Sequence, residues 1–327
     1  MPAPYNTNST AAELVPDFSP LIKDKVVLTT GVSPGSLGGT FVLSIAQAKP
    51  SCFILAGRNT EKLEQCAAEI TAETHGIDIR LLQLDLGSLQ NVRNAAAQVN
   101  GWTEFPAIDV LVNNAGIMAV EYGVSVDGFE SHLATNHLGP FLFTNLIMPK
   151  ILMSKAPRVV MVASDAHRLS PIRFDDSNFD EGKTYNKWFA YGQSKTANML
   201  MALSLATKLD VKHGLLAFSL HPGVVFTNID RYVDWSVDME GLRSIDRLLG
   251  NREGWKDFNP KSLEQGAATH VYAAFDPALK ANNGAYLIES HVADPLSDTV
   301  KPWATSSLEA ERLWKLSEEL VGEKFLY

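Results

Sequence analysis

The chain has 327 residues, of which 46% are hydrophobic and 20% are charged, so it can bury a large core and has the composition of a soluble globular protein. Its net charge of −9 argues against a nucleic-acid partner or an anionic membrane surface, because both need basic patches. No apolar run reaches the roughly 18 residues that a membrane span needs. Cys52 and Cys66 lack C-x-x-C spacing, so we expect reduced core residues of a cytoplasmic protein.

The predicted elements begin after a polar leader, residues 1–24, which has neither the apolar core nor the basic start of a secretion signal. Apolar, β-branched runs predict strands, and the segments between them have helical spacing. The predicted strands are residues 25–30, 51–56, 79–86, 108–114, 158–164 and 215–221, with an edge strand at 285–290 and a terminal helix at 306–322. Continuous apolar runs are typical of parallel strands buried on both faces. The β–α alternation therefore predicts one α/β domain, residues 25–327, with a Rossmann-type, doubly wound parallel sheet of about seven strands and helices on both faces.

The segment after the first predicted strand, TTGVSPGSLGG at residues 29–39, fits two kinds of chemistry. Gly31, Ser33 and Gly35 spell the G-x-S-x-G of a hydrolase nucleophile elbow. An elbow is disfavoured, because only one strand precedes Ser33 and no oxyanion glycine run lies upstream. The first β–α turn of a doubly wound sheet is instead where a dinucleotide pyrophosphate rests on a helix N-terminus. We therefore interpret Gly31, Ser33, Gly35, Leu37 and Gly38 as cofactor-binding, although a glycine turn without a ligand stays open from this loop alone.

Further motifs, taken in order with this loop, resemble the short-chain dehydrogenase/reductase family: NNAG at 113–116, Ser164 after the fifth strand and YGQSK at 191–195. The resemblance runs from about residue 25 to at least residue 227. It is closest to the retinol-dehydrogenase-like branch, through VDGFESHLATNHLGPFLFTNLI at 126–147 and HPGVVFT at 221–227. The family usually has T-G-x-x-x-G-x-G, whereas the third glycine here is Gly38, one residue later. The glycine loop is therefore expected to be one residue longer, which leaves open the amides that contact the pyrophosphate.

The residue types also indicate carbonyl chemistry. Tyr191 and Lys195 share a helix face, and a nearby ammonium lowers the phenol pKa from its usual value of about 10. The resemblance implies that Tyr191 donates the proton and that Lys195 also holds the nicotinamide ribose. It further implies that Ser164 holds the substrate oxygen. Asn136, beside a helix kink predicted at Pro140, would hold a water that relays protons to the lysine.

The end of the second strand favours NADP(H) over NAD(H). The segment LAGRN offers Arg58 and no acidic residue, and an arginine here accommodates a 2′-phosphate. Asp85 resembles the aspartate that contacts the adenine; it could also cap the next helix, and the two roles are compatible. The remaining cofactor contacts implied by the resemblance are Leu86, Asn113, Ala115, Gly116, Pro222, Gly223, Val225 and Thr227.

Two long, aromatic-rich insertions are expected to form substrate lids. We call residues 165–190 the first insertion and residues 228–262 the second insertion. Their aromatic side chains could line an apolar pocket or only pack the lids onto the body: Tyr185, Trp188, Phe189, Tyr232, Trp235 and Trp255. The histidines lack ligand spacing, so no catalytic metal is expected.

The sequence thus predicts an NADPH-dependent reductase of a bulky apolar or aromatic ketone or aldehyde, reversible to an alcohol dehydrogenase. Its partner is a small-molecule carbonyl or alcohol, and a homodimer is a candidate assembly. One alternative is a relative that reduces a C=N bond or an aromatic ring. Another is a protein that binds NADP(H) without turnover. The presence of Asn136, Ser164, Tyr191 and Lys195 together argues against this second alternative.

Overall fold

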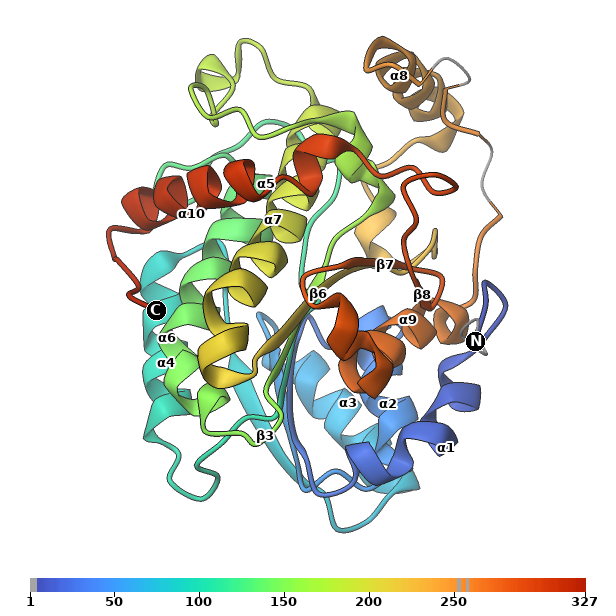
Figure 1. The fold of residues 1–327 in the computed structure, drawn as a ribbon, viewed down its shortest axis with the longest axis vertical. Helices are drawn as coiled ribbons and strands as arrows, with labels where there is room; N and C mark the ends of the chain where they lie inside the picture. Colours follow the sequence, from blue (N-terminus) through green and yellow to red (C-terminus); the bar gives the residue numbers. More distant parts are fainter. Residues whose placement is uncertain (1–4, 252–253, 257–258) are drawn as a thin grey trace.

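A sheet of eight strands crosses the middle of the protein in a computed structural model, which describes residues 5–251, 254–256 and 259–327 (Figure 1). The strands up to β7 pair in parallel, and β8 pairs with β7 in antiparallel orientation. The spatial order is β3 (Asp78–Gln83), β2 (Cys52–Gly57), β1 (Val26–Thr30), β4 (Val110–Asn113), β5 (Arg158–Val162), β6 (Leu216–His221), β7 (Tyr286–Ile288) and β8 (His291–Val292). The chain thus builds outward from β1 in both directions, and such a sheet has its ligand crevice beside β1 and β4.

The predicted doubly wound α/β fold is confirmed, with one strand more than expected. The predicted edge strand at 285–290 ends at Ile288, because Glu289 and Ser290 have φ angles of 50° and 60°. Two successive residues with positive φ form the tight turn of a β-hairpin. The chain therefore reverses there and adds β8.

Helices cover both faces of the sheet (Figure 1). One apolar core lies under α4 (Leu89–Gly101), α6 (Gly139–Leu152), α7 (Lys187–His213) and α10 (Ser307–Val321). The other lies under α1 (Ala11–Ile22), α2 (Leu37–Ala46), α3 (Thr60–Glu73) and α9 (Leu263–Phe275). Figure 1 shows α8 (Trp235–Leu248) at the edge of the molecule, away from these layers. Within the described ranges, no helix combines the length and the apolar character that a membrane crossing requires.

The segment expected to be a polar leader contains α1, while its residues 1–4 lie outside the described residues. Thr10 and Glu13 form a capping box that starts the helix. Pro16 and Pro20 lie inside it, and prolines normally disrupt a helix interior. Because of these prolines, a helix was not predicted here, although the apolar side chains that pack against the core have helical spacing: Leu14, Val15, Phe18 and Ile22.

The kink predicted beside Asn136 takes the form of a π-helical turn, Ala134–Leu138, between the short helix α5 (Ser131–Leu133) and α6. The Gly139 amide bonds to the Ala134 carbonyl across this wider turn. Pro140, in the first turn of α6, has no amide hydrogen to contribute. Such π-turns often occur at functional sites, and this one places Asn136 against Ile117, which follows β4.

Candidate active site

A cavity of about 360 Å³ opens at the carboxyl ends of β1, β2, β4, β5 and β6. It lies at the crevice that the strand order indicates for a ligand. Most of the predicted site residues line it: Gly31, Ser33, Leu37, Arg58, Leu86, Ala115, Gly116, Ser164, Tyr191, Lys195, Pro222, Gly223, Val225 and Thr227.

Five predicted residues do not line the cavity: Gly35, Gly38, Asp85, Asn113 and Asn136. The Asn113 side chain is buried behind β4, where it donates to the Thr144 hydroxyl at 2.9 Å. Its neighbour Asn114 lines the cavity instead, because successive strand residues point to opposite faces. The Asp85 carboxylate accepts from the Gly87 amide at 3.0 Å. The alternative that Asp85 caps the next helix is wrong, since Ser88 caps α4.

The glycine loop brings three backbone segments close together. Gly31 has φ of 71°, and a Cβ there would lie 2.7 Å from the Ala115 Cα. Only glycine fits a backbone that is both left-handed and this crowded. A Cβ on Gly38 would lie 2.6 Å from the Nδ2 atom of the Asn114 side chain. The displaced third glycine therefore allows α2 to pack closely against the segment after β4. The loop before this glycine faces the cavity.

Ser36 starts α2 and directs the helix N-terminus toward the cavity. Its hydroxyl accepts from the Gly39 amide at 3.1 Å and donates to the Ser33 carbonyl at 2.7 Å. The amides of the first turn, which have no partner within a helix, are the groups that bind phosphate. Ser36 was missed because the family motif places no serine there, although a serine directly before a helix is a common capping signal.

Tyr191 and Lys195 lie one turn apart on α7 and are almost fully buried. Asn186 caps this helix by accepting from the amides of Trp188 and Phe189, which fixes Tyr191 in its second turn. The Lys195 Nζ atom lies 5.5 Å from the centre of the Tyr191 ring and donates to the Val162 carbonyl at 2.9 Å. The helix thus presents a phenol and an ammonium together at the end of β5.

Burial controls the protonation of both groups. It raises the pKa of Tyr191 to about 12, and a hydrogen bond with Ser164 lowers that pKa only in part. The expected lowering by Lys195 does not dominate in this structure. Burial lowers the pKa of Lys195 to about 8. At neutral pH the phenol therefore carries its proton and can act as an acid, while the lysine remains mostly charged.

Ser164 follows β5 and caps a short 3-10 helix, Asp165–Leu169. Its hydroxyl oxygen accepts from the Ala166 amide at 3.1 Å. Ser164 also lowers the pKa of Tyr191 in part, and both residues line the cavity. A carbonyl oxygen bound between them would receive two hydroxyl donors.

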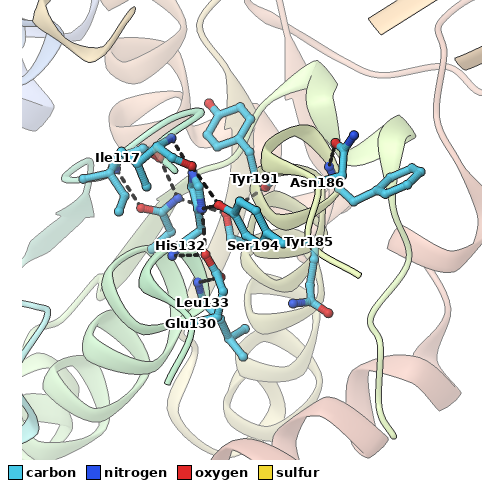
Figure 2. A network of polar contacts seen from close by, with 12 residues as sticks. Ile117, Glu130, His132, Leu133, Tyr185, Asn186, Tyr191 and Ser194 are labelled. Carbon is cyan, nitrogen blue, oxygen red and sulfur yellow. Dashed lines mark hydrogen bonds and ion pairs between the residues drawn. The ribbon is translucent and has the colours of Figure 1, made fainter. Parts of the chain in front are cut away.

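The Asn136 side chain is committed to the protein around it. Its carbonyl oxygen accepts from the Ile117 amide at 2.8 Å, and its amide donates to the Ile117 carbonyl and the Ser194 hydroxyl, each at 2.9 Å. Figure 2 labels two of these partners, Ile117 and Ser194. A Cβ on Gly116 would lie 3.1 Å from the Asn136 oxygen and 3.6 Å from the Lys195 nitrogen. Asn136 therefore joins the segment after β4 to α7 directly beneath the lysine.

The far end of the cavity, after β2, carries two basic residues. Arg58 follows the strand, Asn59 caps α3, and Lys62 lies in the first turn of that helix. Lys62 was missed at the sequence level. It could have been predicted from its position four residues after Arg58, because the first turn of a helix that follows a strand end faces the same crevice as that strand end.

Aromatic side chains line the opposite end. Of the aromatic residues predicted in the insertions, Trp188, Tyr232, Trp235 and Trp255 line the cavity, whereas Tyr185 and Phe189 do not. The Trp188 ring lies 6.4 Å from the Tyr191 ring and 6.2 Å from the Trp235 ring. Trp188 therefore stands between the proposed acid and the second insertion.

Two carboxylates of α8 fasten the second insertion to the first. Asp246 is fully buried and accepts from two nitrogens of Arg168, both at 2.7 Å. Asp238 accepts from the Trp188 indole at 3.0 Å and pairs with Lys187 at 2.8 Å. Residues 252–253 and 257–258 of this insertion lie outside the described residues.

The buried histidines are occupied by structural contacts. The His137 Nε2 atom lies 2.7 Å from the Ser317 hydroxyl of α10, and burial lowers the pKa of this ring to about 3. In the part of the chain that the structure describes, no three His, Cys, Asp or Glu residues are grouped so that they could hold a metal ion. Cys52 and Cys66 are free and buried.

Comparisons with known proteins agree with this geometry. A family model described as short chain dehydrogenase matches residues 25–175. The chain is 35% identical to Retinol dehydrogenase 12 of Bos taurus over 91% of this chain and 86% of that protein. It is also 35% identical to Short-chain dehydrogenase/reductase prx1 of Penicillium rubens, over 97% and 92%. A crystal structure of an uncharacterized protein from Mycobacterium paratuberculosis aligns with a TM-score of 0.69 at 30% identity, over 94% of this chain and 96% of that one. The chain belongs to the short-chain dehydrogenase/reductase family, in its retinol-dehydrogenase-like branch, as the motifs predicted.

Proposed function

We propose that this protein is an NADPH-dependent reductase of bulky apolar or aromatic ketones and aldehydes, reversible to an alcohol dehydrogenase. Membership of the family makes it an oxidoreductase that uses a nicotinamide cofactor. The observation that carries the proposal is the meeting of Tyr191, Ser164 and Lys195 at one cavity. One end of this cavity is basic and the other is aromatic.

The residues present fit a nicotinamide dinucleotide. The glycine loop and the N-terminus of α2 suit a pyrophosphate, and the segment 222–227 lines the cavity beside Lys195. Bound NADPH supplies the hydride that reaches the carbonyl carbon. Lys195 would hold the nicotinamide ribose, and Asn136 would keep the segment after β4 against α7 beneath it.

The protein's own groups act on the substrate oxygen. Ser164 donates a hydrogen bond to the carbonyl and orients it, which stabilises negative charge as it develops on that oxygen. Tyr191 transfers its phenolic proton to the oxygen, so that the product is the alcohol and the tyrosine is left as phenolate. The Lys195 ammonium stabilises this phenolate. In the oxidative direction the phenolate takes the proton back.

Arg58 and Lys62 support the choice of NADP(H). A 2′-phosphate bound after β2 would contact the Arg58 guanidinium, which can bind phosphate through two parallel hydrogen bonds. The same position in an NAD enzyme offers a carboxylate to the ribose hydroxyls, and here it offers Arg58 and Asn59.

The aromatic part of the cavity lining supports a planar, apolar substrate. The lining includes Trp188, Trp235, Trp255, Phe226 and Leu242. Aromatic rings bind flat, apolar molecules through buried contact area and stacking. One relative is named for retinol, an apolar alcohol with a conjugated chain. We include retinal and retinol among the first substrates to test.

The experiment measures NADPH oxidation with a panel of ketones and aldehydes, scored by product analysis. We expect turnover of bulky apolar carbonyls, little turnover of small charged ones, and tighter binding of NADPH than of NADH. Equal affinities would contradict the cofactor assignment. Turnover restricted to imines or aromatic rings would support the alternative chemistry, and tight NADPH binding without any turnover would support a non-catalytic protein. The cytoplasmic location and the homodimer stay predictions.

A further inference from the structure

The loop after β4 forms one wall of the substrate end in a strained conformation. Ile117 and Met118 line the cavity. Met118 and Ala119 pack in one apolar cluster with Trp188, Tyr191 and residues of α8. Ala119 has φ of 52°, a left-handed conformation that is unfavourable for a residue with a Cβ. Such backbone persists only where the surrounding structure holds it.

One clamp holds the start of this loop. Asn136 bonds to both polar groups of the Ile117 backbone, its carbonyl oxygen to the amide and its amide to the carbonyl. This contact holds the chain before Ala119. A second contact is needed to hold the chain after it.

A second clamp holds Val120, directly after the strained residue. The Tyr185 hydroxyl donates to the Val120 carbonyl at 2.8 Å. The Val120 amide donates to the His132 Nε2 atom at 3.4 Å. Both polar groups of Val120 are thus bound by side chains, one from the first insertion and one from α5. Figure 2 shows His132 and Tyr185 in the same network as Ile117.

Glu130 fixes the form of the histidine. The His132 Nε2 atom accepts a hydrogen bond, so the ring proton belongs on Nδ1, which lies 2.8 Å from the Glu130 carboxylate. The same carboxylate accepts from the amides of His132 and Leu133, each at 2.8 Å. Glu130 and His132 are fully buried. The carboxylate is thereby satisfied and holds the imidazole in the tautomer that can receive the Val120 amide.

The first insertion holds the tyrosine of this clamp. The Tyr185 ring meets the Tyr122 and Phe179 rings edge to face, at 5.3 and 5.4 Å. Asn178 accepts from the Glu130 amide at 2.8 Å. The part of this insertion that does not line the cavity therefore supports the loop that does.

We infer that Tyr185, His132 and Glu130 are positioning residues that hold residues 117–120 in their strained conformation and so place Met118 in the substrate wall beside Tyr191. This inference rests on the proposed function for its substrate, and on the contacts alone for the clamp. None of the three residues lines the cavity, so they act through the loop.

The first test is Tyr185→Phe, which removes one donor and keeps the ring between its aromatic neighbours. We expect KM for a bulky carbonyl to rise roughly three- to tenfold, the scale of one lost neutral hydrogen bond. We expect kcat and the NADPH Kd to stay within about twofold, since the groups that touch the reacting atoms are unchanged. Amide hydrogen exchange at 117–120 should become faster. The matched control is Tyr327→Phe, because that hydroxyl donates to Asn145 at the same 2.8 Å on the α6 face. It should leave KM and loop exchange unchanged.

The second test adds Ala119→Gly to Tyr185→Phe. Glycine adopts positive φ without the steric cost, so the loop needs its clamp less and both KM and exchange should return toward wild type. A purely structural role of Tyr185 would lower Tm without moving KM, and Ala119→Gly would then restore nothing; that pattern would overturn the inference. Faster exchange with unchanged KM would also overturn it, by removing Met118 from the substrate wall. If the wild type reduces no carbonyl, the proposed function fails, while the exchange measurements still decide whether the clamp exists.

Discussion

The two ends of the cavity are built from different parts of the chain. At the cofactor end, backbone at the ends of β1 and β2 and the N-terminus of α2 form the surface, and glycine is required where backbone segments approach closely. At the substrate end, side chains from two insertions form most of the surface together with the loop after β4, and α8 is fastened by ion pairs. The first end depends on backbone geometry, whereas the second depends on which side chains the insertions carry.

Because of this difference, we expect one end to determine cofactor binding and the other to determine substrate choice. A backbone cradle would accept the part of a nicotinamide cofactor that all family members share. An aromatic wall on insertions can change without disturbing the sheet, because loops tolerate substitution better than strands. The proposed reacting groups, Tyr191 and Ser164, lie between the two ends. Substitutions at each end should therefore affect cofactor and substrate separately.

Tyr191→Phe should have the largest effect and should spare both ends. It keeps the ring and removes only the proton donor, so the rate should fall by about a hundred- to ten-thousand-fold. NADPH affinity should largely persist, because the phenol acts chiefly in the transition state. Steady-state kinetics on a confirmed substrate, with fluorescence titration of NADPH, measure the two quantities. Near-normal turnover would show that the proton comes from another group.

Asp246→Ala should break the substrate end alone. It leaves the buried Arg168 without its bidentate partner, and we expect a loss of about 3 kcal/mol, the low end for a broken buried pair, because Asp165 still pairs with Arg168. KM for the carbonyl should rise while NADPH affinity is retained. The control is Glu311→Ala, which breaks the more exposed pair with Lys208 and should cost less than about 1 kcal/mol. Equal loss of cofactor and substrate binding would mean that the two ends are not independent.

Arg58→Asp should break the cofactor end alone. Losing a charged hydrogen bond to phosphate costs about 1.5–3 kcal/mol, so NADPH affinity should fall about 10- to 100-fold while NADH affinity holds or improves. Arg80→Asp makes the same change of charge on β3 at a residue that does not line the cavity. It should leave the preference intact. A similar shift in both variants would assign the effect to net charge rather than to a phosphate site.

The pH profile tests the groups between the two ends. Burial lowers the pKa of Lys195 from 10.5 to about 8, so its charge is present below that pH and is lost as the pH rises through it. Reduction should then fall by up to about tenfold per pH unit above pH 8, because the phenolate left on Tyr191 loses its stabilising ammonium. Oxidation should rise with pH up to about 8 and level off above it, since burial raises the pKa of Tyr191 to about 12 and its phenolate is stabilised only while Lys195 is charged. A reduction rate that is flat to pH 10 would contradict this assignment.

The sequence predicted the cofactor end in more detail than the substrate end, for a physical reason. Glycines, Tyr191 and Lys195 occur at spacings that one backbone geometry requires, so their order alone indicated the fold and most of the cavity lining. Asn113 was chosen over Asn114 because a motif does not say which strand face a residue takes. The π-turn at Asn136, the hairpin at Glu289 and the ion pair of Arg168 with Asp246 depend on contacts between distant segments. No local pattern encodes those contacts.

Ser33→Ala should have the smallest effect, and it tests whether the glycine loop is a phosphate cradle or a nucleophile elbow. Ser33 is tied to Ser36 through its backbone amide and carbonyl, so its side chain can be truncated without disturbing the loop. We expect NADPH affinity to fall about two- to fivefold, as for one weak hydrogen bond. Ser36→Ala removes the cap of α2 and should cost more, about 0.5–2 kcal/mol of stability, with a larger loss of affinity. A backbone cradle depends on the capping serine, whereas a nucleophile elbow depends on Ser33 itself. Covalent labelling of Ser33 by a fluorophosphonate probe, abolished in Ser33→Ala, would therefore replace the cradle with a hydrolase site.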